Sequence, residues 1–407
     1  MIDTAGPKAT ATARRGPVMD RRALTRTIVI VVLLLLALLA LPPLMSAYYT
    51  STMIQVAIYS IVTLGLGLLV GRVGLYSLGQ LAVLTIGAWV GARLLFATSQ
   101  PFILVMIEAG LVTMIIGSLI TLPALRLRGL YLALITLMLA GGVTVVMQTL
   151  NFPNGGGGFS GYNGSQLHIP QIRRPSFAGT DPAFYRFSVI VAIVMFLLVF
   201  VHLRTRPGRA WAAIKQSEPS ALAAGINTTF YKLWAMALAA FVTGVAGALL
   251  AGYQRELLSI QFPIQNSILL LAVVLVGGAF SLAGAVVAGF LQAFLPAALY
   301  NLWGVPNDWL IILFGLGVMQ VLATAPGGIA DQFPKDMKRL YRQISRLWRP
   351  APPPATADGA ARRIIIQETA EIHTRSVVIE EYGQARAAAE EQADLGPSRG
   401  AEGEREP

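Results

Sequence analysis

The most constraining feature of this 407-residue sequence is an uncharged stretch, since no Asp, Glu, Lys or Arg occurs between Thr27 and Gly71. About 20 apolar residues cross a bilayer as a helix, so this stretch is long enough for at least two crossings. Pro42–Pro43 and the Tyr48–Tyr49 pair predict the turn between them, at the interface where aromatic residues gather. The alternative for residues 1–45 is a cleaved signal peptide. No clear small-x-small cleavage site follows and many apolar segments do, so a retained first helix is preferred.

The rest of the chain repeats this pattern of long apolar segments. Charged residues make up 13% of the sequence and hydrophobic residues 55%. Soluble domains contain about 25% charged residues, which they need to form a polar surface, so a soluble enzyme is excluded.

The sequence predicts an all-α fold, a polytopic transmembrane helix bundle of about 8–10 spans. The candidate spans are 28–45, 52–70, 80–98, 102–121, 129–150, 187–203, 231–252, 266–282, 284–303 and 308–325. The pair 266–303 has few polar residues at its turn, so a re-entrant segment is its alternative.

The distribution of charge predicts the orientation of the chain in the membrane and the location of its terminal segments. With a cytoplasmic N-terminus and ten crossings, the main basic clusters fall inside, as the positive-inside rule requires. They are Arg72, Arg126–Arg128, the 204–230 loop and the 335–349 run, and the exceptions are Arg173, Arg174 and Arg186 in the long outside loop 151–186. We therefore expect a basic cytoplasmic segment at 1–27, a transmembrane domain at 28–325, a basic cytoplasmic segment at 326–350 and a disordered acidic cytoplasmic tail at 351–407.

Nucleic-acid binding and metal chemistry have little support. The net charge is +11, but the Arg and Lys residues are scattered between apolar segments, so the partner they indicate is a lipid bilayer and no nucleic acid. The chain has no Cys, and its three His residues, His168, His202 and His373, are isolated. That spacing offers no set of metal ligands, and no metal site is expected.

The segment 204–230 differs from its surroundings because it predicts two short amphipathic helices rather than a crossing. Over 208–216, Trp211 and Ile214 share one face, and Arg209 and Lys215 are expected to be exposed. Next, Ser217 offers an N-cap, Glu218 and Pro219 fall in the first turn, and Gly225 fits a C′ stop. A plain interfacial helix joining two spans is the alternative.

The run GRAWAAIKQSEPSALAAGINTTFYKLWAMALAAFVTGVAGALLAG resembles the best recognised stretch of the branched-chain amino acid permeases of ABC importers. Four other segments resemble the family in the same order: VGLYSLGQLAVLTIGAWVGA, LRLRGLYLALITLMLAGG, NGGGGFSG and SILLLAVVLVGGAFSLAGAVVAG. The resemblance covers roughly residues 50–325. The chain departs from the general coupling motif of importers, Glu-Ala-Ala-x3-Gly, because Pro219 and Ser220 follow Glu218 and Gly225 lies seven positions on.

The resemblance implies a permease subunit in the bacterial plasma (inner) membrane and no enzyme. The implied partners are a second homologous permease subunit, two ABC ATPase subunits and an extracytoplasmic solute-binding protein. No Walker sequence occurs in the chain, so no cofactor is expected on it, and ATP and Mg are expected on the partner ATPases. The implied coupling residues are Arg209, Trp211, Glu218, Ala221, Ala224 and Gly225. The alternatives are a urea or amide importer permease, and a stand-alone channel or ion-coupled carrier.

Polar residues inside spans are the candidates for the translocation path, because burying them in a membrane is costly. Ser77, Gly79 and Gln80 interrupt the apolar pattern and predict either a broken helix or a tight loop. Glu108 is the only acid deep in a predicted span. It is expected either to belong to the path or to be a neutral or interface-facing residue. Thr144 and Gln148 fall on one helix face, where they line a path or bond a neighbouring helix.

Glycine is expected to serve two further purposes. Gly155, Gly156, Gly157 and Gly158 form an outer loop, either part of a gate or a flexible linker. Small residues four apart, such as Gly87 with Gly91 and Gly244 with Ala248, predict close helix packing.

Overall fold

The computed structural model describes residues 46–127, 129–149, 174–254 and 261–304, with isolated residues at 172, at 257 and between 309 and 332. The chain divides into two compact units, Met1–Met337 and Lys338–Pro407, and every described residue belongs to the first. The predicted span 28–45 and the segments 1–27 and 351–407 lie outside the described residues. Only isolated positions of 308–325 and 326–350 are described.

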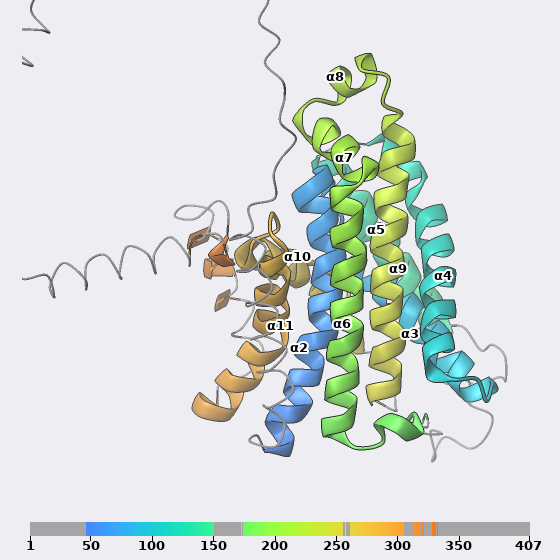
Figure 1. Ribbon diagram of the computed structural model, residues 1–407. Helices are drawn as coiled ribbons and strands as arrows, with labels where there is room; N and C mark the ends of the chain where they lie inside the picture. Colours follow the sequence, from blue (N-terminus) through green and yellow to red (C-terminus); the bar gives the residue numbers. More distant parts are fainter. Residues whose placement is uncertain are drawn as a thin grey trace, which may run out of the picture. The chain divides into compact units, whose positions relative to one another are not determined.

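The regular structure of the described residues is helical (Figure 1). Its longer helices are α2 (Ala47–Gly67), which continues into the π-helical turn η2 (Leu68–Val73), then α3 (Gln80–Ala97), α4 (Phe102–Thr121), α5 (Leu130–Thr149), α6 (Asp181–Arg204), α7 (Arg206–Gln216), α9 (Thr228–Gln254), α10 (Gln265–Gly277) and α11 (Leu282–Trp303). Shorter elements are η3 (Pro123–Arg126), η4 (Ser176–Ala178) and α8 (Glu218–Ala223). This confirms the all-α prediction.

Six helices in the described part of the chain are long and apolar enough to cross a membrane. They are α2 with η2, α3, α4, α6, α9 and α11, and they coincide with the predicted spans 52–70, 80–98, 102–121, 187–203, 231–252 and 284–303. The predicted span 129–150 coincides with α5, whose apolar section Tyr131–Met147 is shorter. Helix α10 has only 13 residues, about 20 Å at 1.5 Å per residue, which is less than a bilayer core of about 30 Å. Its length favours the re-entrant alternative for this segment.

Helix α9 is the most enclosed of the long helices and packs against α2, α3 and α4. Its contact with α3 consists of small residues. A Cβ added at Gly87 would lie 2.6 Å from the Gly244 Cα, and one added at Gly91 would lie 2.7 Å from the Ala248 Cα. The two backbones therefore touch, which confirms the predicted close packing and explains why no side chain larger than that of alanine fits at these contact positions.

Large apolar side chains cover the outward faces of the peripheral helices. Exposed residues include Ile103, Ile107, Leu111, Ile115 and Leu119 on α4, Met138 and Val145 on α5, and Ile190, Val194 and Leu197 on α6. A continuous apolar face of this extent is unfavourable in water and favourable in lipid. Because helices satisfy their own backbone hydrogen bonds, the chain is suited to a bilayer, and it is a multi-pass membrane protein.

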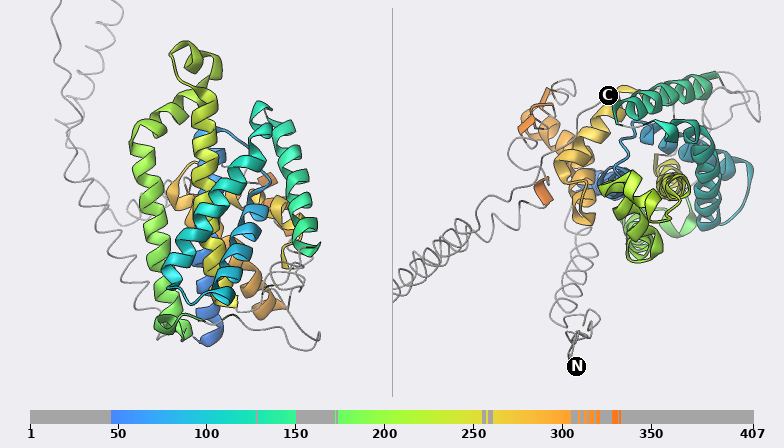
Figure 2. Two further views of the ribbon diagram at one scale, coloured as in Figure 1. Left: turned by 90° about the vertical axis from the view of Figure 1, so that its right-hand side faces the viewer. Right: turned by 90° about the horizontal axis from the view of Figure 1, so that it is seen from above.

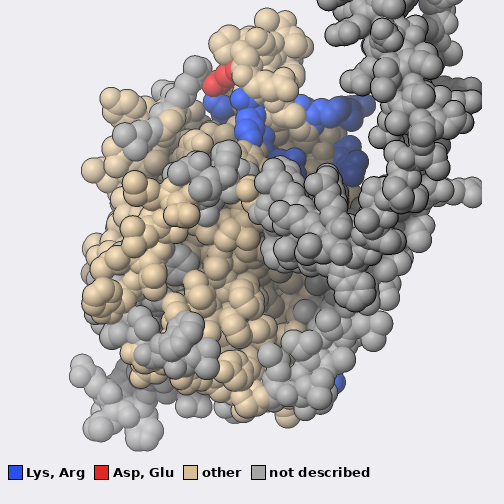
Figure 3. Space-filling view, turned by 90° about the vertical axis from the view of Figure 1, so that its left-hand side faces the viewer, with Lys and Arg blue, Asp and Glu red and all other residues tan. Residues whose placement is uncertain are grey.

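The two ends of the bundle differ in charge and in shape. Helices α7 and α8 project at one end, which is at the top of Figure 1 and of the left view in Figure 2. The Lys and Arg side chains on one face gather just below this projection in Figure 3. Arg204 at the end of α6 and Arg206 and Arg209 in α7 are exposed. The opposite end carries the segment before α6 and the last turn of α9.

Candidate functional site

The projecting α7–α8 segment is fixed to the bundle by one face of α7. Trp211 is completely buried, Ile214 is 5% exposed, and the Trp211 indole Nε1 donates to the carbonyl of Tyr231 in α9 at 2.8 Å. Arg209 and Lys215 are exposed, as the helical periodicity predicts. The indole therefore fixes the orientation of α7 through both apolar burial and one directed hydrogen bond.

Lys215 joins α7 to the end of α2. Its Nζ donates to the carbonyl of Gly71 in η2 at 2.6 Å and lies 4.2 Å from the centroid of the Phe280 ring, in the turn between α10 and α11. Although the Lys215 residue as a whole is exposed, partial burial of its ammonium lowers its pKa, and the nearby charge of Arg72 lowers the pKa further. A cation at the C-terminal end of a helix interacts favourably with its unpaired carbonyls, so this contact links α7, η2 and the α10–α11 turn.

Helix α8 has the terminal residues that its sequence predicts. The Ser217 side chain accepts from the backbone N–H of Ser220, with Glu218 and Pro219 in the first turn. At the other end, Gly225 has a φ of 78°, and the N–H of Ile226 donates to the carbonyl of Ala221 at 3.0 Å. These are the features of a left-handed C-terminal cap, which favours glycine because a Cβ is strained there.

An ion pair connects α8 to the first turns of α9. The Lys232 Nζ and the Glu218 Oε1 are 2.6 Å apart, and their side chains are 7% and 18% exposed. The Glu218 carboxylate therefore turns toward the bundle. In this arrangement it positions α8 and is mostly covered.

The coupling candidates divide into exposed and buried groups. Arg209, Ala224 and Gly225 are exposed, whereas Trp211 and Ala221 are buried against the bundle. Leu222 on α8 is 54% exposed, and the sequence interpretation did not single it out. Thus the residues that hold α8 and the residues that it presents are different sets.

The segment before α3, for which the sequence predicts a broken helix or a tight loop, is not helical. After η2, Gly74 adopts a φ of 83° and residues 74–79 are not helical. Ser77 and Gln80 are each 3% exposed. The Ser77 hydroxyl accepts from the N–H of Gly79 at 3.3 Å, and the Thr136 hydroxyl of α5 accepts from the N–H of Leu78 at 2.9 Å. Side chains thus satisfy backbone groups that the broken helix leaves free.

Gln80 connects the start of α3 to the middle of α9. Its Nε2 donates to the carbonyl of Ala239 at 3.3 Å and to the hydroxyl of Thr243. Beside it, Gly79, Gly117, Thr136 and other residues of α3, α4 and α5 line a narrow cavity of about 20 Å³. Such a volume holds about one water molecule, which is too little for a small-molecule ligand.

The other path candidates do not meet at one place. Glu108 is half-buried on α4, and no hydrogen bond or ion pair joins it to another described residue. The Thr144 hydroxyl donates to the carbonyl of Ala140 in its own helix at 3.0 Å. The Gln148 side chain and the loop holding Gly155, Gly156, Gly157 and Gly158 lie outside the described residues.

Sequence reasoning missed Lys232 and Thr136. Thr136 lies in the segment LRLRGLYLALITLMLAGG, one of the motifs that resemble the family. The motif does not indicate that the Thr136 hydroxyl bonds the N–H of Leu78. Lys232 had only a weak signal, a lone basic residue 14 positions after Glu218.

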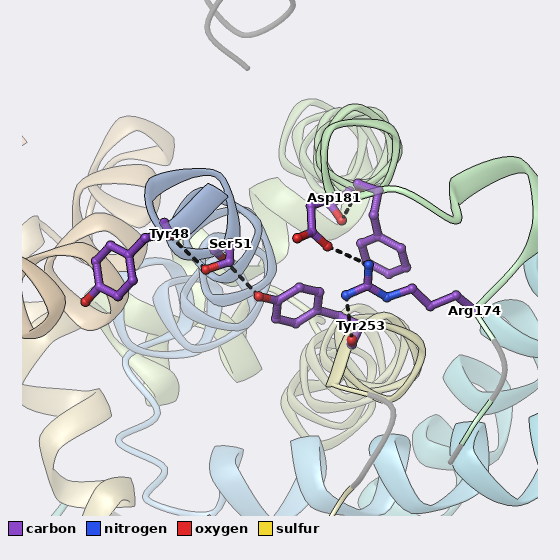
Figure 4. A network of polar contacts seen from close by, with 7 residues as sticks. Tyr48, Ser51, Arg174, Asp181 and Tyr253 are labelled. Carbon is purple, nitrogen blue, oxygen red and sulfur yellow. Dashed lines mark hydrogen bonds and ion pairs between the residues drawn. The ribbon is translucent and has the colours of Figure 1, made fainter. Parts of the chain in front are cut away.

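A polar network at the opposite end of the bundle was also not predicted (Figure 4). Arg174, one of the outside arginines, pairs with Asp181 at 2.5 Å and donates to the carbonyl of Tyr253 at 3.3 Å. The Tyr253 hydroxyl donates to the carbonyl of Ser51 at 3.3 Å. The network joins the ends of α2, α6 and α9, three segments that are distant in sequence.

Comparison with known proteins agrees with these features. Residues 48–322 match the model of a family described as "Branched-chain amino acid transport system / permease component". The chain is 28% identical to the high-affinity branched-chain amino acid transport system permease protein LivM of Salmonella typhimurium, over 80% of this chain and 78% of the relative. It is 30% identical to the protein of the same name from Escherichia coli, over 67% of each chain. No solved structure matches the chain.

Proposed function

The chain belongs to the permease family of branched-chain amino acid transport systems, and from this premise we propose that it is one of two membrane subunits of an ATP-driven importer. Its cargo is a branched-chain or related hydrophobic amino acid. The two subunits form a path that opens alternately to each side of the bacterial inner membrane. ATP binding and hydrolysis on partner chains bias which side is open.

The observation that carries the ATP-driven mechanism is the α7–α8 segment. A six-residue helix with a side-chain N-cap and a glycine C-cap projects from the bundle and exposes Leu222. A channel or an ion-driven carrier has no need for such a helix. An ATPase that docks on α8 can transmit force to α9 through the Lys232–Glu218 pair and to η2 through Lys215.

The partners follow from what the chain lacks and from where its charges lie. No Walker sequence occurs in the 407 residues, so the ATP and Mg sites belong to two ABC ATPase subunits. The basic α7–α8 end faces the cytoplasm in this proposal, by the positive-inside rule. A solute-binding protein then delivers the amino acid at the opposite end.

Affinity purification from native membranes tests the class of transporter. The tagged chain, extracted in mild detergent, is expected to bring down a second permease chain and one or two ATPases with Walker sequences. A preparation free of any ATPase that still moves solute in liposomes would show a channel or carrier instead.

Cysteine cross-linking tests the docking helix itself, because the native chain contains no Cys. A Leu222→Cys variant is expected to cross-link to the ATPase in whole membranes. A Ser176→Cys variant, exposed at the opposite end, is the matched control and is expected not to. Cross-linking from Ser176→Cys alone would reverse the proposed orientation.

Uptake measurements test the cargo. In a strain without other importers for these amino acids, deletion of the gene is expected to abolish uptake of leucine, isoleucine and valine. Intact uptake would contradict the cargo and would leave the importer class standing.

A further inference from the structure

The polar network of Arg174, Asp181 and Tyr253 borders a cavity to which the proposed function assigns no role. Gln55, Arg174, Asp181, Tyr253 and Gln254 line a hollow of about 540 Å³ between the ends of α2, α6 and α9. The volume falls within the roughly 300–1,000 Å³ of small-molecule sites. Its lining is mostly polar, whereas the narrow cavity beside Gly79 is apolar.

The charges in this cavity are held in place. The Arg174 guanidinium lies 5.7 Å from the centroid of the Phe184 ring and 5.4 Å from that of the Tyr253 ring. One of its terminal nitrogens pairs with Asp181 and the other donates to the Tyr253 carbonyl. The side chains of Arg174 and Asp181 are 14% and 35% exposed, so the carboxylate keeps more access to solvent. A positive and a negative group are thus fixed side by side before any ligand arrives (Figure 4).

Two atoms of the lining residues have unused hydrogen-bonding capacity. The Arg174 Nε and the Gln254 Oε1 are buried without a hydrogen-bond partner in the described part of the protein. An unmade bond at a buried polar atom costs about 1–3 kcal/mol, so such atoms call for an explanation. One is a donor on a cation and the other is an acceptor, and both are covered in this structure, so a ligand with an acceptor and a donor of its own reaches them once the lining side chains shift.

We propose that this cavity receives the zwitterionic end of an amino acid at the mouth of the transporter, with the carboxylate on Arg174 and the ammonium between Asp181 and Gln254. A carboxylate matches the forked donor edge of a guanidinium, and an ammonium needs acceptor oxygens. The zwitterion adds no net charge to the site, so it can exchange with the Arg174–Asp181 pair without leaving either charge uncompensated. The inference rests on the proposed function and adds the part of the substrate that this chain contacts first.

Gln254→Leu separates a binding role from a purely structural one. The Oε1 has no partner to lose, so this substitution is expected to leave the yield and thermal stability of the complex unchanged or higher. Equilibrium binding of radiolabelled leucine to the whole importer complex in nanodiscs, without its solute-binding protein, is expected to weaken about tenfold, the effect of one lost hydrogen bond to a charged group. Gln292→Leu is the matched control, because Gln292 on α11 also has a buried Oε1 without a partner but does not line the cavity.

Leucine analogues test the chemistry of recognition. Isoamylamine lacks the carboxylate and isocaproate lacks the ammonium, and each is expected to compete at least about tenfold less well than leucine. Equal competition by either analogue would overturn the assignment of that end.

The outcomes separate the site from the transport function. Leucine uptake by the wild-type complex with no change in leucine binding in Gln254→Leu would overturn the site and leave the importer intact. Uptake with no leucine binding to the wild-type complex would do the same. An absence of leucine uptake would overturn the proposed cargo and with it this inference.

Discussion

The α3–α9 contact and the α7–α8 segment are held by different forces. At α3–α9, backbone lies on backbone, with Gly87 against Gly244 and Gly91 against Ala248. At α7–α8, a few directed contacts hold the chain: a buried indole, one ion pair and two helix caps. The first arrangement resists any added atom, and the second tolerates change except at a few named groups. The bundle core is therefore held by close backbone packing along whole helices, whereas the position of the projecting segment depends on a few directed contacts.

The largest expected effect comes from adding volume to the α3–α9 contact. Gly87→Leu would drive its side chain into the Gly244 backbone, at a cost of about 3 kcal/mol or more, because neither helix can retreat. Membrane yield and a single peak in size-exclusion chromatography are expected to be lost. Gly142→Leu on α5 is the control, since an added Cβ there meets nothing within 4 Å. Equal yields of the two variants would remove the distinction between the contact and an ordinary helix face.

The next largest effect comes from breaking the ion pair in the α7–α8 segment. Lys232→Met removes the ammonium from its ion pair with the mostly covered Glu218 carboxylate, at a cost of about 2 kcal/mol in the position of α8. ATPase co-purification and transport are expected to fall while membrane yield stays at the wild-type level. The double variant Glu218→Gln with Lys232→Met is expected to recover part of the binding, and a further loss in it would argue against a paired role.

A smaller local effect is expected at the end of α8. Gly225→Val strains a residue with a φ of 78° by about 1–2 kcal/mol. Transport should fall while membrane insertion survives, and Gly225→Asn should be milder because Asn tolerates this conformation better. Normal transport in Gly225→Val would remove the interpretation of 217–225 as a capped docking helix.

The smallest effect is expected where a polar group joins the tight contact. Gln80→Leu removes hydrogen bonds to Ala239 and Thr243, and such bonds between membrane helices contribute only about 0.6 kcal/mol on average. Thermal stability in detergent should decrease slightly, much less than in Gly87→Leu. A strong loss of transport with unchanged stability would instead indicate that Gln80 lines the path.

Local features of the sequence were enough to predict the long helices and the capped helix α8. Six predicted spans coincide with long apolar helices, because a run of apolar residues specifies its own backbone hydrogen bonding in lipid. Ser217, Pro219 and Gly225 were placed correctly because a cap depends on neighbours within a few residues. The sequence could not separate residues that hold α8 from residues that it exposes, since Glu218 turns inward only because Lys232 lies beside it.

The candidate path residues stay predictions, because their positions in the fold do not by themselves show which side chains line a path. Ser77, Gly79 and Gln80 lie together at the break before α3, but Glu108 and Thr144 lie elsewhere on α4 and α5. Polarity within an apolar run reveals that a residue needs a partner, and it does not reveal which one. Thr144 donates a hydrogen bond within its own helix, whereas Gln80 donates one to Ala239, which is 159 residues away in the sequence.

The sequence by itself determined the class of protein, the order of its helices, the capped helix α8 and the small-residue faces, because each depends on composition or on spacing along one segment. Only the tertiary structure decided which faces meet, which way Glu218 turns and that Arg174, Asp181 and Tyr253 form one network. The Tyr253 contacts with Arg174 and Ser51, for example, bring residues 79 and 202 positions apart to a distance of 3.3 Å. No local pattern records that distance, because it is set by how whole helices cross.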